Sequence, residues 1–201
     1  MRANGRVEIM SINFFELCST SRSCFSKTTI HSRRFPFRVK ADGNCLYNAC
    51  ALGLIGNEDK SLTLLLRLLT SMELFVHAEH YLEYFNQIFT SQDGQTQTKA
   101  HFLNAILSME SGDKVTKPAF YSEYPTAFRH ESLLNCKTGK WSSLVCVAAL
   151  SSVLNHSIKV LYSPPRNVRL FSVFTPYKFA PRCSTSSAKD TILLMSTTEK
   201  L

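Results

Sequence analysis

Residues 39–49 read VKADGNCLYNA, and this stretch carries the strongest structural signal in the chain. A turn-forming Asp-Gly pair is followed by residues at helical spacing, namely Leu46, Cys50 and Leu54. The pattern predicts a helix that begins at about Cys45, so that this cysteine lies in the first turn. Unpaired amide groups and the positive end of the helix dipole favour the thiolate there, lowering a cysteine pKa from about 8.5 toward 7 or below. The same amides could hold a developing oxyanion.

This stretch closely resembles the nucleophile motif of the ovarian tumour (OTU) family of cysteine proteases, which reads roughly as hydrophobic, any residue, D-G-N-C-L-[FY]-x-A. Residues 141–162 are similar to the family's later segment, in which a Trp and small residues open a helix that leads into a strand. The resemblance extends over about Val39 to Met195. It implies an α/β domain of the α+β type with an OTU-like, papain-related fold, in which helices flank a small central sheet.

The resemblance also implies a function and a site. OTU enzymes are isopeptidases that act on ubiquitin or ubiquitin-like conjugates, and Cys45 matches their attacking thiolate. The amides of Gly43, Asn44 and Cys45 would line the oxyanion hole. Asp42 is often included in the active site of the family, but it is equally interpreted as a turn and cap residue, and both roles remain open.

A thiol protease also needs an imidazole that takes the thiol proton. In the OTU family this histidine comes late, after the element that corresponds here to residues 191–195, whereas His156 is the last histidine of this sequence. Activity of this chain is therefore expected to be impaired. Three interpretations remain open: a truncated chain, a non-catalytic protein-binding module of a larger regulatory or transposon-derived protein, and a substitute base. The candidate bases are His31, His77, His80, His101, His130 and His156, of which the last is expected in a surface turn.

Charge divides the chain into two parts. The net charge is +8, and before residue 41 eight basic residues face only Glu8 and Glu16. Residues 1–38 are expected to be a basic, poorly ordered leader, with a mitochondrial transit segment or a weak nucleic-acid contact as alternatives. Residues 39–201 are expected to form the OTU-like domain, incomplete at its C-terminus. This domain is nearly neutral, so we expect no nucleic-acid binding by it.

The remaining signals concern the redox state of the cysteines, membrane spans, and metal or cofactor sites. Seven cysteines without regular spacing favour reduced thiols in an intracellular protein, cytoplasmic or nuclear. The leucine-rich residues 62–69 are interrupted by Arg67 and are far short of the roughly 20 apolar residues of a membrane span. His77 and His80 share a helix face, but the sequence has no C-x-x-C pair and no phosphate-binding loop. We therefore predict no membrane segment, no metal and no cofactor.

The apolar spacing predicts the other elements. Gly56 should end the first helix, and a long helix capped by Ser61 should present Leu62, Leu65, Leu66, Leu69, Met72, Val76, Phe85 and Phe89 on one face. Further predictions are a helix at 100–109, a partly ordered loop at 115–140, a buried helix at 144–154, a hairpin of strands 158–162 and 168–174 around a turn at 164–167, a loop at 176–190, and a last strand at 191–195 with an exposed edge.

Overall fold

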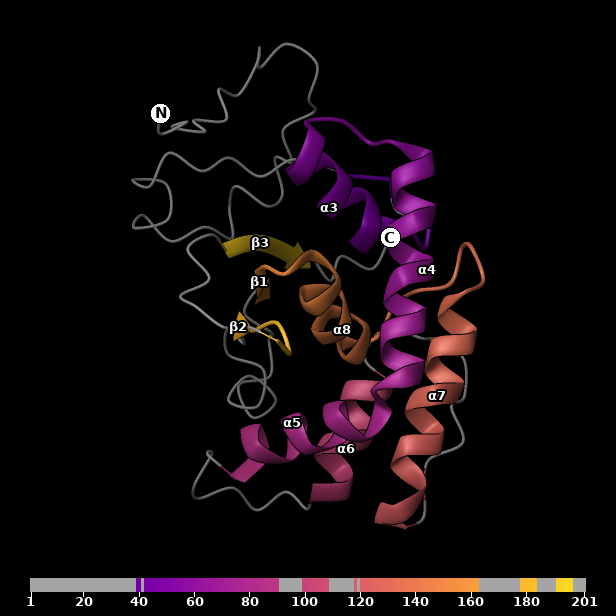
Figure 1. Cartoon of the computed structure of the whole chain (residues 1–201), viewed down its shortest axis with the longest axis vertical. Helices are drawn as coiled ribbons and strands as arrows, with labels where there is room; N and C mark the ends of the chain where they lie inside the picture. Colours follow the sequence, from indigo (N-terminus) through magenta and orange to yellow (C-terminus); the bar gives the residue numbers. More distant parts are fainter. Residues whose placement is uncertain are drawn as a thin grey trace.

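The computed structural model describes residues 39–40, 42–90, 99–108, 118, 120–162, 178–183 and 191–196. Their elements are α3 (Cys45–Ile55), α4 (Lys60–Val76), α5 (Ala78–Thr90), α6 (Lys99–Ser108), the 3-10 helix η2 (Tyr121–Glu123), α7 (Tyr124–Asn135), α8 (Leu144–Leu154), β1 (Ser157–Tyr162), β2 (Lys178–Phe179) and β3 (Thr191–Ser196). Helix α8 lies between the small sheet and α4, and α7 runs beside α4 (Figure 1). The predicted α+β class is confirmed.

The sheet has the strand order β2-β1-β3. Strand β1 pairs antiparallel with β2 and parallel with β3, with Ser157 opposite Thr191. The predicted strands at 158–162 and 191–195 are therefore confirmed. The predicted hairpin partner at 168–174 and its turn lie outside the described residues. The prediction of a loop throughout 176–190 is wrong at β2, because a strand of two residues is too short to show a periodicity.

Helix α8 connects the sheet to the helices. Its residues from Leu144 to Ser151 are all buried, as its almost uniformly apolar sequence predicts. The helix ends at Asn155, which has a left-handed φ of 51°. A short asparagine tolerates this conformation, and the chain turns there into β1. The predicted central helix at 144–154 is confirmed.

Helix α3 begins at Cys45 and ends at Ile55, as predicted from the spacing of its apolar residues. Gly56 follows with a φ of 77°, and its amide donates to the carbonyl of Leu52. This is the left-handed helix end that glycine favours, since it has no Cβ.

The predicted long helix from Ser61 to Phe89 is wrong, because α4 and α5 meet at a bend of 83°. The start of α4 also differs, since Asp59 is the N-cap and its carboxylate accepts a hydrogen bond of 2.6 Å from the amide of Leu62.

Within the described ranges, no single helix is long and apolar enough to cross a bilayer. The bent pair of α4 and α5 together reaches the length and apolar composition of a membrane span, by length and composition only.

The predicted loop at 115–140 is wrong over Tyr124–Asn135, where the chain forms α7. Pro125 lies in the first turn of this helix, where its missing N–H costs nothing. Further along, Glu131 and Asn135 are buried although they are polar. The inward face of α7 therefore lacks the apolar periodicity that would have predicted it.

An aromatic cluster closes the end of the core away from α3. The ring of Phe85 on α5 lies 6.5 Å from that of Phe102, 6.4 Å from that of Phe128 and 6.1 Å from that of Phe179, measured between centroids. These contacts join α5, α6, α7 and β2, and rings at such distances add to the stabilisation from burial.

Candidate active site

The turn before α3 is organised by Asp42. Its Oδ1 accepts a hydrogen bond of 2.9 Å from the amide of Asn44 and one of 3.3 Å from Nδ2 of Asn48. A carboxylate that accepts from the amide two residues later makes an Asx turn, and the second bond ties this turn to the first turn of α3. Asp42 thus has the predicted turn role, and a further catalytic role stays a prediction. Cys45 follows as the first residue of the helix.

Gly43 brings this turn against a second turn after α7. Its φ is 77°, and a Cβ built on it would lie 2.2 Å from the carbonyl oxygen of Gly139. No side chain fits at that distance, so the two backbones can pack in this way only if residue 43 is glycine. The glycine of the motif is therefore required by a close backbone approach as well as by its φ.

Arg67 of α4 holds the two turns together from inside. Its side chain is buried, with 1% exposed, and its guanidinium donates to four oxygens. The distances are 2.9 Å to the carbonyl of Gly43 and 2.8 Å to Oδ1 of Asn44. The other two acceptors are the carbonyls of Asn135 and Lys140, at the end of α7 and in the turn after it. All four acceptors are uncharged oxygens. We call this set of contacts the Arg67 clamp.

A polar network continues behind the clamp. Oδ1 of Asn135 accepts from the hydroxyl of Tyr47 at 2.9 Å and from Oγ of Ser142 at 2.8 Å, while its Nδ2 donates to Ser71 at 2.9 Å. Burial raises the pKa of Tyr47, so its hydroxyl stays protonated and can donate. The guanidinium of Arg67 also lies 5.2 Å from the centre of the Tyr47 ring. The network joins α3, α4, α7 and the start of α8.

The described cysteines differ in their surroundings. Cys50 is fully buried, and burial raises the pKa of its thiol to about 12. Burial likewise raises the pKa of Cys146, whose sulfur is 3.9 Å from the Glu131 carboxylate. Cys136 and Cys183 are exposed and follow α7 and β2. Among the cysteines that the structure describes, only Cys45 is both half-buried and at the start of a helix.

The structure also places the candidate bases. His77 lies at the bend after α4, 3.7 Å from Glu73 and 3.0 Å from Arg182. It is ten residues beyond Arg67, a rise of about 15 Å along the helix axis, which argues against it as a partner for Cys45.

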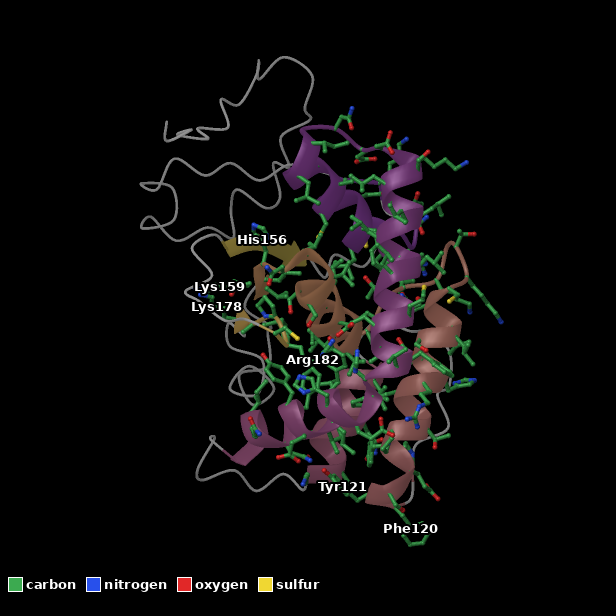
Figure 2. The ribbon with its side chains drawn as sticks, in the orientation of Figure 1. Phe120, Tyr121, His156, Lys159, Lys178 and Arg182 are labelled. Atoms are coloured by element: carbon green, nitrogen blue, oxygen red, sulfur yellow. The ribbon has the colours of Figure 1, made fainter. Side chains whose placement is uncertain are left out.

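The other histidines lie on several elements. His80 and His130 are exposed on α5 and α7. His156 lies in the turn between α8 and β1, as predicted, with Nδ1 at 2.7 Å from the carbonyl oxygen of Leu154 (Figure 2). His31 and the side chain of His101 lie outside the described part. In that part, no group of three or more His, Cys, Asp or Glu side chains could hold a metal ion.

Sequence reasoning missed Arg67, Asn135 and Gly139. In the sequence alone, Arg67 is only an interruption of a leucine-rich stretch. A signal for it exists, because the polar residues Thr63, Arg67, Thr70 and Ser71 recur at helical spacing and are all buried. Such a polar stripe on an otherwise apolar helix indicates a buried hydrogen-bonded network.

The described part of the chain has an α+β fold and a site with a cysteine at the start of a helix. The family whose profile matches the chain is described as "Vertnin, OTU domain", and the match spans residues 36–197. The chain therefore belongs to the Vertnin OTU-domain family. A comparison with curated proteins finds no match.

Proposed function

We propose that this OTU domain is a thiol-dependent isopeptidase that acts on ubiquitin or ubiquitin-like conjugates, with Cys45 as its nucleophile. The observation that carries the proposal is the position of Cys45, which opens α3 on a turn fixed by Gly139 and the Arg67 clamp. A nucleophile must be reachable and must be held in one geometry, and this turn supports both. The compartment that fits such a reduced thiol is the cytoplasm or the nucleus.

In the proposed reaction, the Cys45 sulfur attacks the carbonyl carbon of the isopeptide bond and the amine leaves as the thioester forms. Backbone amides near the turn would bind the oxyanion. The amide of Asn44 already donates to Asp42, so in this conformation it would have to exchange that acceptor for the oxyanion. The thiol proton has to go to a base, for which an imidazole is the usual group, and from that base to the leaving amine.

A ubiquitin probe with an electrophilic C-terminus tests the proposal. We expect the full chain to be labelled, and the variant Cys45→Ala not to be labelled. The matched control is Cys183→Ala, which removes an exposed thiol that follows β2 and should label as the unchanged protein does. Labelling that persists in Cys45→Ala, or that is lost in Cys183→Ala, would assign the reaction to another thiol.

The base can be tested in the same assay with free imidazole. If the pocket holds the thiol correctly and lacks only a proton acceptor, added imidazole should accelerate labelling at Cys45 in proportion to its concentration. The variant Cys45→Ala should not respond. Labelling that occurs at the same rate with and without imidazole would show that the base is already supplied within the chain.

The second candidate function is a non-catalytic OTU module that binds protein partners within a larger protein. The broad apolar surface that α4 exposes favours it, because such surfaces mark interaction sites. A folded chain that the probe does not label, with or without imidazole, would support this function against the first.

A further inference from the structure

Helix α4 is inverted relative to an ordinary surface helix. Its buried residues include the polar Thr63, Arg67, Thr70 and Ser71, whereas most of its large apolar residues face outward. The exposed fractions are 38% for Leu64, 50% for Leu65, 49% for Leu68, 38% for Leu69, 55% for Met72, 43% for Phe75 and 62% for Val76. We call these seven residues the α4 surface. A soluble chain usually buries such a stripe.

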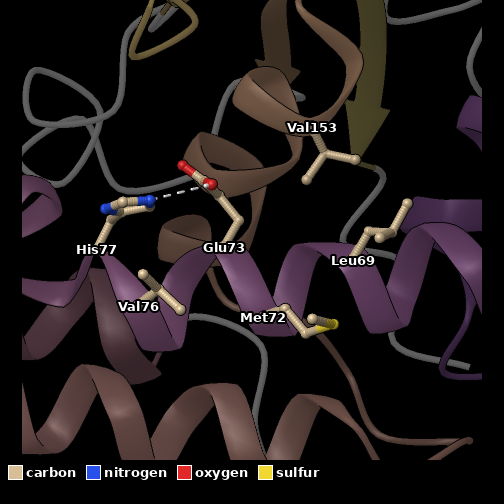
Figure 3. Close-up of a pocket in the computed structure, with 6 residues that line it drawn as sticks. All are labelled: Leu69, Met72, Glu73, Val76, His77 and Val153. Atoms are coloured by element: carbon tan, nitrogen blue, oxygen red, sulfur yellow. Dashed lines mark ion pairs between the residues drawn. The ribbon is translucent and has the colours of Figure 1, made fainter.

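Part of the α4 surface borders a shallow, open groove. Leu69, Met72 and Val76 line a groove of about 330 Å³ together with Val153 of α8 (Figure 3). The carboxylate of Glu73 also lines the groove, and it already accepts from Tyr81 at 2.8 Å and from Arg182 at 3.0 Å. Covering the groove would therefore bury no unpaired carboxylate.

Another part of the α4 surface forms a ridge. Leu64, Leu68 and Phe75 are separated by four and seven residues, so they lie in one row along the helix. At about 100° per residue, this row lies roughly 90° around the helix from the groove residues. One helix thus presents a ridge and, next to it, a groove.

A second copy of the chain fits this arrangement better than an unrelated partner. A two-fold interface uses the same surface twice, so it must contain both a protruding and a receiving part. Ridges that pack into grooves are also the usual geometry of helix pairs. Seven side chains about half exposed present roughly 600 Å², at the upper limit of patches on monomers. A stable interface needs about 800 Å² from each partner, which neighbouring residues of α4 and α8 can complete.

We propose that the α4 surface is a two-fold interface, through which two copies of the chain pair along α4 with the ridge of each copy in the groove of the other. Burial of apolar area drives this association. The proposal does not depend on the reactivity of Cys45, because the Arg67 clamp lies on the opposite face of the same helix.

Sedimentation velocity of the full chain over a range of concentrations tests the proposal. We expect a monomer–dimer equilibrium, and the variant Leu68→Glu should weaken it by roughly 100-fold or more, because the charge enters the interface twice. The matched control is Phe120→Glu, a large apolar residue that is 69% exposed near the start of α7, away from α4 (Figure 2). This control should dimerise as the unchanged chain does, and circular dichroism should show both variants folded.

Two results would overturn the proposal. One is a monomer at every concentration, and the other is equal dimerisation by Leu68→Glu and Phe120→Glu. If the unchanged chain is a monomer, proteolysis of residues 1–38 that is faster in Leu68→Glu than in the unchanged chain would identify that segment as the occupant of the α4 surface. Binding of the unchanged chain to phosphatidylserine vesicles would identify lipid as the occupant.

Discussion

The variant Arg67→Met should lose about 3 to 5 kcal/mol of unfolding free energy. Methionine can fill much of the space, but it donates to none of the four oxygens that the guanidinium now contacts. These oxygens belong to the turn before α3, the end of α7 and the turn after it. Because small domains are stable by only about 5 to 15 kcal/mol, the variant should be close to unfolding. Urea denaturation followed by circular dichroism measures the change.

The matched control is Arg129→Met, which removes an arginine from an ion pair with exposed Glu79. An exposed pair contributes little, so the stability of this variant should be almost unchanged. Arg67→Lys should be intermediate, because an ammonium keeps the charge but cannot reach four acceptors with the geometry of a guanidinium. Equal stability of Arg67→Met and Arg129→Met would contradict the clamp.

The variant Gly43→Ala should disturb the nucleophile turn most directly. A Cβ at residue 43 would lie 2.2 Å from the Gly139 oxygen, so one of the two turns has to move. We expect a loss of about 2 to 4 kcal/mol from the left-handed φ and the overpacking together. A shift of about 1 Å at the sulfur can slow a reaction 100-fold, so labelling of Cys45 by the ubiquitin probe should slow by a factor of that order.

The variant Gly56→Ala separates the cost of the left-handed φ from the effect of the close contact with Gly139. Gly56 has the same φ of 77°, but a Cβ there meets nothing within 4 Å. This variant should therefore lose only the cost of the left-handed conformation, about 1 to 2 kcal/mol, and should be labelled at the normal rate. If both glycine variants were labelled equally slowly, the contact between Gly43 and Gly139 would not explain the geometry of the site.

The sequence predicts those parts of the fold that depend on local pattern. The start of α3 at Cys45 follows from a turn and a helical period, and α8 follows from a long apolar run. Strands β1 and β3 are likewise short apolar runs. In each of these elements, the pattern of apolar residues matches the burial of the element in the structure.

The rest depends on partners that are distant in the sequence. Arg67 can be buried only because Gly43, Asn135 and Lys140 bring oxygens to it, and no local pattern contains that information. Helix α7 escapes prediction for the same reason, since Glu131, Ser132 and Asn135 among its buried residues are polar, and Asn135 finds its partner Ser71 on α4. The polar face of α4 is buried because it holds the turns of the site together. The leucines of this helix therefore lie on its opposite, outward face.

Cys45, presented by the turn at 42–45, should be the most reactive thiol among the cysteines that the structure describes. Competitive alkylation tests this prediction most directly: the folded protein is treated with limiting iodoacetamide near neutral pH, and the modified cysteines are quantified by peptide mass spectrometry. Exposure alone would rank Cys136 and Cys183 first. We expect half-buried Cys45 to react faster than both, because a cysteine in the first turn of a helix favours its thiolate form. Alkylation of Cys45 slower than that of Cys136 and Cys183 would contradict this prediction.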